Sequence, residues 1–210
     1  MTKPLRILVL GMLCAVVAGC TSTTANTEPL ALGPTAAPAA MSQANFSGAP
    51  QTGEIAQDLY YIEFRARTAE SYGHTFAMFG RRDAAGNILT REVAGLHPAS
   101  TSVVPYLAGH VVPVPSETGP SDGDLEDAYM IANYRIDLTR AEYENVLAYI
   151  RQLQASRPLW HAALYNCNSF VGDIARHMGL RAPANHLLFP EQYINTMKEM
   201  NAGRRPFGNA

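Results

Sequence analysis

One cysteine and several histidines are the residues of this chain best suited to chemistry. The chain has three cysteines, Cys14, Cys20 and Cys167, and six histidines. Only Cys167 lies outside the N-terminal region, and apolar spacing over the residues that follow predicts that it begins a helix. The unpaired N–H groups and positive dipole end of a first helical turn stabilise a thiolate. Cys167 is therefore the candidate nucleophile.

A thiol nucleophile needs a base, and position along the chain separates the histidines. His177 falls at the far end of the cysteine's own helix, roughly 15 Å away at 1.5 Å per residue, which is too far to accept its proton. His186 follows that helix in a loop, with no feature that directs it back. His161 is a base of last resort, close to Cys167 only in sequence. His74 opens an apolar strand-like run, so we expect it to be the general base.

A third group would hold the base in its productive orientation. If the hairpin after His74 turns near Ala85, position 74 faces about position 96, which brings His97 alongside. Two histidines at neighbouring strand ends could then act as base and orienting partner. A slip of one residue would send a side chain to the other face. Glu92, on the same strand as the expected partner, is the alternative.

Strand-like patterns fill the first half of the body. Alternation over 59–67 predicts a half-buried strand, with Tyr60, Ile62 and Phe64 facing the core and Tyr61, Glu63 and Arg65 on the other face. The run 75–79 is apolar on both faces, as in a central strand. Turn-forming residues at 82–87 and a second strand-like run at 88–93 then predict a hairpin.

The middle of the chain is less regular. Residues 103–114 are strand-like but interrupted by Pro105 and Pro113, which predicts an edge or irregular strand. Residues 115–127 are polar, glycine-rich and acidic, and could form a loop that covers a cleft. A further strand-like run follows at 129–138.

Helix signals dominate the rest of the chain. Thr139 is a good N-cap because Glu142 completes a capping box, so a helix should begin there. A second helix should begin at Asn166 or Cys167 and end at Gly179. A third should follow residue 190. The fold class expected from these elements is α+β, with a small antiparallel sheet packed against two or three helices.

Residues 1–19 have the layout of an export signal: a basic start, an apolar run and small residues before a cysteine. The apolar run of about 12 residues is short for a bilayer span. The segment Val17-Ala18-Gly19-Cys20 resembles the bacterial lipobox. That resemblance implies cleavage before Cys20 and lipidation of its thiol, which would attach the protein to a membrane. Thr21 stands where an aspartate would favour inner-membrane retention, so the expectation is an outer-membrane lipoprotein facing the periplasm.

The remaining chain divides by composition. Residues 20–56 contain few large apolar side chains and predict a flexible tether, with an end-to-end distance on the order of 30 Å. Residues 57–201 have the size of one domain, and 202–210 form a C-terminal tail. The net charge of −2 and the lack of long basic runs disfavour nucleic-acid binding.

No cofactor or metal is expected, because no glycine-rich phosphate loop, HExxH or CxxC spacing is present. A zinc site made of His74, His97 and Cys167 is the one metal arrangement that the residue types would allow.

Two sequence elements carry a resemblance to a known superfamily. These are His74 in Tyr-Gly-His-Thr-Phe and Cys167 in Tyr-Asn-Cys-Asn-Ser-Phe-Val. In this order they resemble the circularly permuted branch of the papain-like NlpC superfamily, which includes lecithin:retinol acyltransferase-like proteins and deconjugating isopeptidases. The resemblance covers about 110 of the 210 residues.

The resemblance implies a papain-like core in which Cys167 is the nucleophile, His74 the base and His97 the third residue. Backbone N–H groups at the helix start, around Asn166 and Asn168, would stabilise an oxyanion. The implied activity is hydrolysis of amide bonds, with peptidoglycan peptides as the nearest substrate. Acyl transfer involving lipid esters and a catalytically silent envelope-binding module are the alternatives.

Overall fold

The structure is a computed structural model that describes residues 59–208. The predicted signal peptide, the predicted lipidation site Cys20 and the whole predicted tether, 20–56, lie outside the described residues. None of the helices within 59–208 combines the length and apolar character that crossing a membrane requires.

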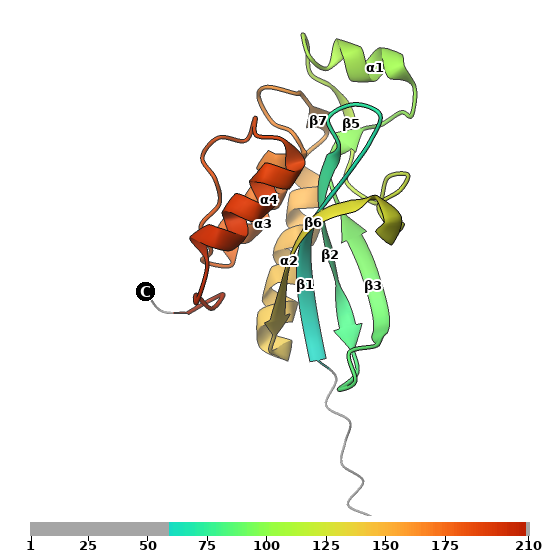
Figure 1. Cartoon of the computed structure of the whole chain (residues 1–210). Coiled ribbons are helices and arrows are strands. Elements are labelled where there is room, and N and C mark those ends of the chain that lie inside the picture. Colours follow the sequence, from blue (N-terminus) through green and yellow to red (C-terminus); the bar gives the residue numbers. More distant parts are fainter. Residues whose placement is uncertain (1–58, 209–210) are drawn as a thin grey trace, which may run out of the picture. The chain divides into compact units, whose positions relative to one another are not determined.

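Two antiparallel sheets organise the described residues (Figure 1). The larger has the strand order β3 (Ile88–Ala94), β2 (His74–Arg82), β1 (Leu59–Arg67) and β6 (Met130–Leu138). The smaller contains the short strands β4 (His97–Pro98), β5 (Val114–Glu117) and β7 (Leu159–Trp160). The helices are α1 (Val103–Ala108), α2 (Arg140–Ser156), α3 (Cys167–His177) and α4 (Pro190–Met200), and η1 (Asp127–Tyr129) is a 3-10 turn. The expected α+β class is confirmed.

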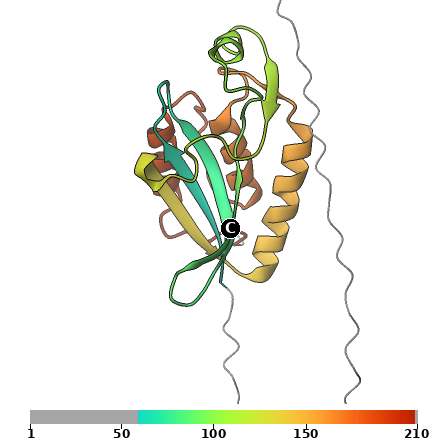
Figure 2. The same cartoon turned by 90° about the vertical axis from the view of Figure 1, so that its right-hand side faces the viewer.

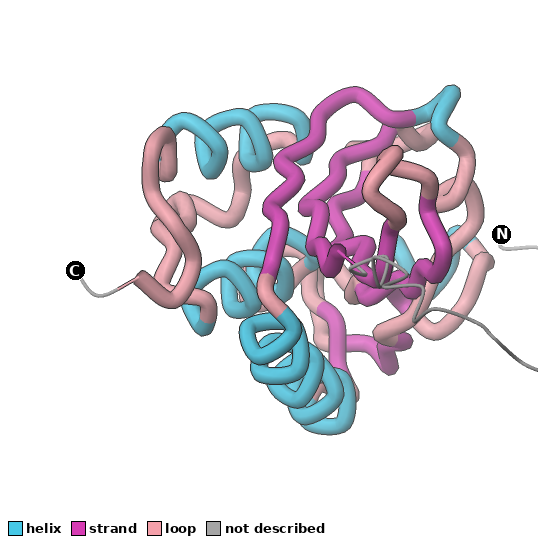
Figure 3. The backbone as a smooth tube through the Cα atoms, turned by 90° about the horizontal axis from the view of Figure 1, so that it is seen from below, coloured by secondary structure: helices cyan, strands magenta, loops and turns pink. Residues whose placement is uncertain are grey.

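The main core lies between the four-stranded sheet and the helices α2, α3 and α4, which cover one of its faces (Figures 1 and 3). Ile62 and Phe64 of β1 and Phe79 of β2 are fully buried there. Val146 and Ile150 of α2 meet them from the helical side. This packing fixes where α3, and therefore Cys167, sits relative to the sheet.

Local signals at the helix ends match the prediction. Thr139 caps α2, and both hydrogen bonds of the capping box with Glu142 are present. Asn166 caps α3 and forms a second capping box with Ser169. Gly179, just beyond α3, has a φ of 74°, a conformation that glycine adopts without strain.

The second face of β1 differs from the prediction, because it is buried rather than exposed. Tyr61, Glu63 and Arg65 are all less than a tenth exposed. Glu63 accepts hydrogen bonds from Arg65 at 3.2 Å and from Arg135 at 2.8 Å. Alternation of polar and apolar residues does not distinguish a solvated face from a buried ion-paired one.

Residues 103–114 also differ from the prediction of a strand. They begin with the helix α1, capped by Ser102, whose hydroxyl accepts from the backbone N–H of Val104. Pro105 occupies the third helical position, where its missing N–H would have had no acceptor within the helix. Proline therefore excluded a central strand here but was compatible with the first turn of a helix.

The antiparallel register brings the ends of several strands together at one end of the sheet, near α1 (Figures 1 and 2). Arg67, which ends β1, pairs with His74, which begins β2, and with Met130, which begins β6. The start of α3 reaches the same end, because the Thr75 hydroxyl donates to Asn168 Oδ1 at 2.9 Å. Residues far apart in sequence therefore meet around His74.

Candidate active site

A cavity of about 1630 Å³ opens at this end of the sheet. Its lining includes all the residues predicted for the site: His74, His97, Asn166, Cys167 and Asn168. Cys167 and the predicted base His74 therefore line the same cavity, and no hydrogen bond joins their side chains.

Cys167 is the first residue of α3 and is partly exposed. It is the one cysteine among residues 59–208. The backbone N–H groups of Cys167 and Asn168 belong to the first turn, so neither has an acceptor within the helix. They can therefore serve a developing negative charge on a substrate oxygen beside the sulfur.

The asparagines that flank Cys167 fix a loop beside it. Asn166 Nδ2 donates to the carbonyl oxygen of His186 at 3.1 Å. Asn168 Nδ2 donates to the carbonyl oxygens of His186 at 3.0 Å and Leu188 at 2.8 Å. His186 consequently lines the cavity, which corrects the expectation that nothing directs it back. The side-chain amides of Asn166 and Asn168 bind the loop that carries His186 and so hold it beside Cys167.

His74 is a buried, neutral imidazole. Its side chain is 8% exposed, and burial lowers its pKa to about 4. The negative charge of Asp124 acts in the opposite direction on that pKa, while Arg67 and His97 lower it further. At neutral pH the ring is therefore uncharged, and one of its two nitrogens is free to accept a proton.

His97 lies beside His74, as predicted. The two ring centroids are 6.0 Å apart and the rings are nearly perpendicular. His97 Nδ1 is 3.1 Å from the carbonyl oxygen of Pro98. A register irregularity between Arg81 and Arg82 shifts the pairing of β2 with β3 by one residue. Extending that register places position 74 opposite 97, where the simple turn geometry suggested 96.

Asp124 is a site residue that the sequence analysis missed. Its Oδ2 lies 3.9 Å from His74 Nε2, which is longer than a hydrogen bond, and its negative charge partly offsets the effect of burial on the pKa of His74. The carboxylate is buried, and Arg67 Nε donates to its Oδ1 at 2.6 Å. Ser121 donates to Oδ2 through its backbone N–H at 2.8 Å. The acidic 115–127 loop had been assigned only as a cover for a cleft.

This loop is anchored by alternate residues of β1. Arg65 donates to Asp127 at 2.8 Å, and two positions later Arg67 binds Asp124. Residues i and i+2 of a strand share a face, so both arginines extend from the same side of the sheet. The buried polar face of β1 therefore holds Asp124 against the candidate base.

Three other candidate residues do not join the site. Glu92 pairs with Phe79 across the hairpin and forms an ion pair with Arg151. His161 Nδ1 accepts from the backbone N–H of Ala163 instead. His177 stacks on a tyrosine of α2 at the far end of α3. Among residues 59–208, no group of three His, Cys, Asp or Glu side chains is placed so that it could hold a metal ion.

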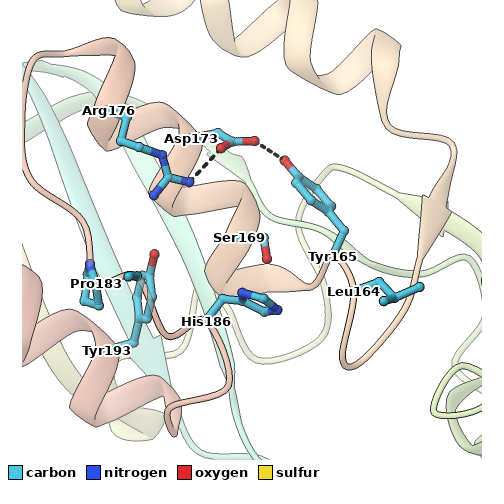
Figure 4. Close-up of a pocket in the computed structure, with 9 residues that line it drawn as sticks. Leu164, Tyr165, Ser169, Asp173, Arg176, Pro183, His186 and Tyr193 are labelled. Carbon is cyan, nitrogen blue, oxygen red and sulfur yellow. Dashed lines mark hydrogen bonds and ion pairs between the residues drawn. The ribbon is translucent and has the colours of Figure 1, made fainter.

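A second, smaller pocket of about 230 Å³ lies on another side of α3 (Figure 4). Its polar centre is Asp173, which accepts from Tyr165 at 2.6 Å and Arg176 at 2.7 Å. Burial and the neighbouring carboxylate raise the pKa of Tyr165, so this hydroxyl remains a donor. These three side chains are paired with one another, and Cys167 does not line the pocket. We therefore assign them the role of holding α3 in place.

Comparisons with known proteins identify no relative. No protein-family model, no curated protein and no solved structure matches the chain.

Proposed function

We propose that this chain is an envelope-anchored thiol hydrolase that cleaves amide bonds through Cys167 and His74. The observation that carries the proposal is the common cavity lined by a helix-start cysteine and a buried neutral histidine. A partly exposed thiol and a neutral histidine that line one cavity are the two groups that nucleophilic catalysis needs.

The orientation of His74 assigns roles to its two nitrogens. Nε2 is buried against Asp124 and Gly95, and a Cβ atom added at Gly95 would lie 2.8 Å from it. The Asp124 charge favours the tautomer that carries its hydrogen on Nε2. Nδ1 then keeps its lone pair and is the nitrogen that accepts the thiol proton. Asp124 is accordingly a positioning residue, and His97 packs against the same ring.

The reaction would proceed in two stages. The thiol proton of Cys167 passes to His74 as the sulfur bonds to the carbonyl carbon, with the oxyanion facing the N–H groups of Cys167 and Asn168. His74 returns the proton to the leaving amine, and the C–N bond breaks to give a thioester. Water, deprotonated by His74, then attacks the thioester and releases the acid and the free thiol.

The same proposal includes a circularly permuted papain-like core. A histidine-bearing strand that precedes a cysteine-bearing helix, with an antiparallel sheet packed on helices, supports a circularly permuted papain-like core. The lipobox-like Val-Ala-Gly-Cys supports lipid attachment at Cys20 and an outer-membrane position facing the periplasm. For a protein attached in this way, peptide bonds of peptidoglycan are the substrate that lies closest in the periplasm.

A second candidate is acyl transfer involving lipid esters. Apolar side chains at the cavity mouth favour it, because Tyr72, Val103 and Phe189 line the cavity and are each more than half exposed. The same thiol would then form a thioester with a fatty acyl group. Digestion of purified peptidoglycan and assays on acyl esters, each compared with Cys167→Ala, separate the two activities.

Thiol reactivity tests the proposal before any substrate is known. Iodoacetamide labelling at pH 7, mapped to Cys167 by mass spectrometry, should be at least tenfold slower in His74→Gln because the base is lost. His177→Gln, a histidine outside the cavity, is the matched control and should label at the wild-type rate. Equal, slow labelling in all three proteins would contradict the proposal and favour a silent envelope-binding module.

A further inference from the structure

The helix α1 and the turn after it form an exposed apolar surface at one end of the molecule (Figures 1 and 2). α1 consists of Val, Val, Pro, Tyr, Leu and Ala, and none of these six residues is buried. A helix that is apolar on all sides is normally a buried one. Nine large apolar side chains among residues 59–208 are more than half exposed, and five of them lie here: Val103, Val104, Leu107, Val111 and Val112. We call these five residues the apolar tip.

The inner side of α1 is held by the fold. Tyr106 packs against the main core and stacks on Trp160, with ring centroids 5.7 Å apart. Gly109 lies against the same indole ring, with no room for a Cβ atom, and its carbonyl oxygen accepts from the N–H of Ala162 at 3.0 Å. α1 is therefore docked through one side and presents the apolar tip on the other.

The apolar tip continues into the mouth of the Cys167 cavity. Val103 belongs to the tip and also lines the cavity. Tyr72 and Phe189 line the cavity as well, and both are more than half exposed. The ring of Tyr72 lies 5.9 Å from that of His110 and 6.3 Å from that of Phe189, measured between centroids. A contiguous exposed apolar surface of this kind marks a place of interaction with another molecule or with a membrane.

The distribution of charge favours lipid over a protein as the partner. Residues 93–116 contain no Asp, Glu, Lys or Arg, although these residue types make up 16% of the chain. A protein partner tolerates charged residues at the rim of its interface, whereas hydrocarbon excludes them, because inserting a charged side chain is costly. Tyr72, beside the tip, has the amphipathic ring that gathers at a membrane–water boundary. An uncharged apolar projection bordered by such a ring matches a lipid surface.

The N-terminal part of the chain would bring this surface within reach of a membrane. The proposed lipid on Cys20 would attach the chain there, and residues 21–58 span over about 100 Å when extended. β1 begins at Leu59, at the end of the sheet opposite α1. Its nine residues cover about 30 Å. The chain before β1 is therefore long enough for the apolar tip to touch the bilayer that holds the anchor.

We propose that the apolar tip inserts into the surface of a zwitterionic phospholipid bilayer and holds the mouth of the Cys167 cavity beside it. This contact is distinct from the proposed hydrolase activity and adds to the proposed lipid anchor. The exposed carboxylates Glu70, Asp122 and Glu126 line the cavity and would be repelled by anionic headgroups, so zwitterionic lipid is the expected surface. Burial of one exposed valine or leucine side chain strengthens binding by about tenfold, so five provide a substantial contact.

The test uses the full chain with Cys20→Ser, which removes the acylation site, and a tryptophan reporter in the tip, Val111→Trp. Phosphatidylcholine vesicles with brominated acyl chains quench tryptophan fluorescence where the indole enters the hydrocarbon. After subtraction of the parent signal, which comes from Trp160 alone, the reporter should lose at least about half of its emission. Leu89→Trp, at an exposed position on the hairpin at the opposite end of the sheet, is the matched control and should lose less than about a tenth.

A second pair of variants tests whether the tip itself makes the contact. Val104→Glu/Leu107→Glu, added to the Val111→Trp chain, should reduce the quenching to the level of the control, because it places charge in the lipid. Neither residue lines the cavity, so iodoacetamide labelling of Cys167 should keep its rate. Ile88→Glu/Leu89→Glu changes two exposed apolar residues of the distant hairpin and should leave the quenching intact.

Quenching at position 111 no greater than at position 89 would overturn the proposal, as would quenching that Val104→Glu/Leu107→Glu leaves unchanged. A dimer in sedimentation equilibrium without vesicles that the same double variant dissociates would assign the surface to a second copy of the chain, and would equally overturn it. Slow thiol labelling in the His74 experiment bears on the hydrolase alone, so the two proposals fail independently.

Discussion

The buried state of His74 makes stability depend on pH in a defined window. Its pKa is about 4 in the folded protein, against 6.5 for an unperturbed histidine. Between these values the unfolded chain binds a proton that the folded protein does not, so stability falls as pH falls from 6.5 to 4. Each pKa unit corresponds to 1.36 kcal/mol, so the full effect is about 3 kcal/mol. Above pH 6.5 this group contributes no pH dependence.

The perturbation that isolates this term is His74→Gln, which keeps a polar side chain but cannot titrate. Urea unfolding of both proteins at several pH values between 4 and 7.5 gives the free energy of unfolding for each. The wild type should lose about 3 kcal/mol more than the variant across the window. All other groups titrate in both proteins, so the difference between the two curves reports His74.

Parallel curves would show that His74 is accessible to protons in the folded state, and would refute the reasoning from burial. A wild type that becomes more stable than the variant as pH falls would mean that Asp124 outweighs desolvation. The activity profile offers an independent check, because a base with a pKa of about 4 should keep kcat/KM high down to about pH 4. An acid limb near pH 6.5 would indicate an unperturbed histidine.

The remaining predictions concern the supports of the site. Gly95→Ala should lower kcat/KM at least tenfold in steady-state assays, because the new methyl would lie 2.8 Å from His74 Nε2; unchanged activity would show that the ring has room to move. Asn168→Ala should lower the free energy of unfolding in urea by about 3 kcal/mol, since the buried amide bonds Thr75 and two loop carbonyls, and a loss under 1 kcal/mol would count against that role. Thr139→Ala removes the α2 cap and should cost about 1 kcal/mol while leaving thiol labelling unaffected.

Much of the site was readable from sequence because its residues begin regular elements. Apolar spacing over the residues that follow placed the start of α3 at Asn166 or Cys167 without any tertiary information, and the helix begins at Cys167. The apolar run after His74 gave β2, and the hairpin that follows brought His97 within one residue of its position. These are local signals, in which side chains bond or pack against neighbours a few residues away.

The tertiary structure decided the features that depend on long-range charge pairs and packing. Asp124 reaches His74 because Arg65 and Arg67 of β1 bind a loop more than 50 positions further along the chain, and no local pattern encodes that contact. The same contacts bury a strand face that alternation had assigned to solvent. Sequence alone therefore determined which residues could react and which elements carry them. The fold decided how their charges are balanced, because burial and ion pairing depend on segments that meet only in three dimensions.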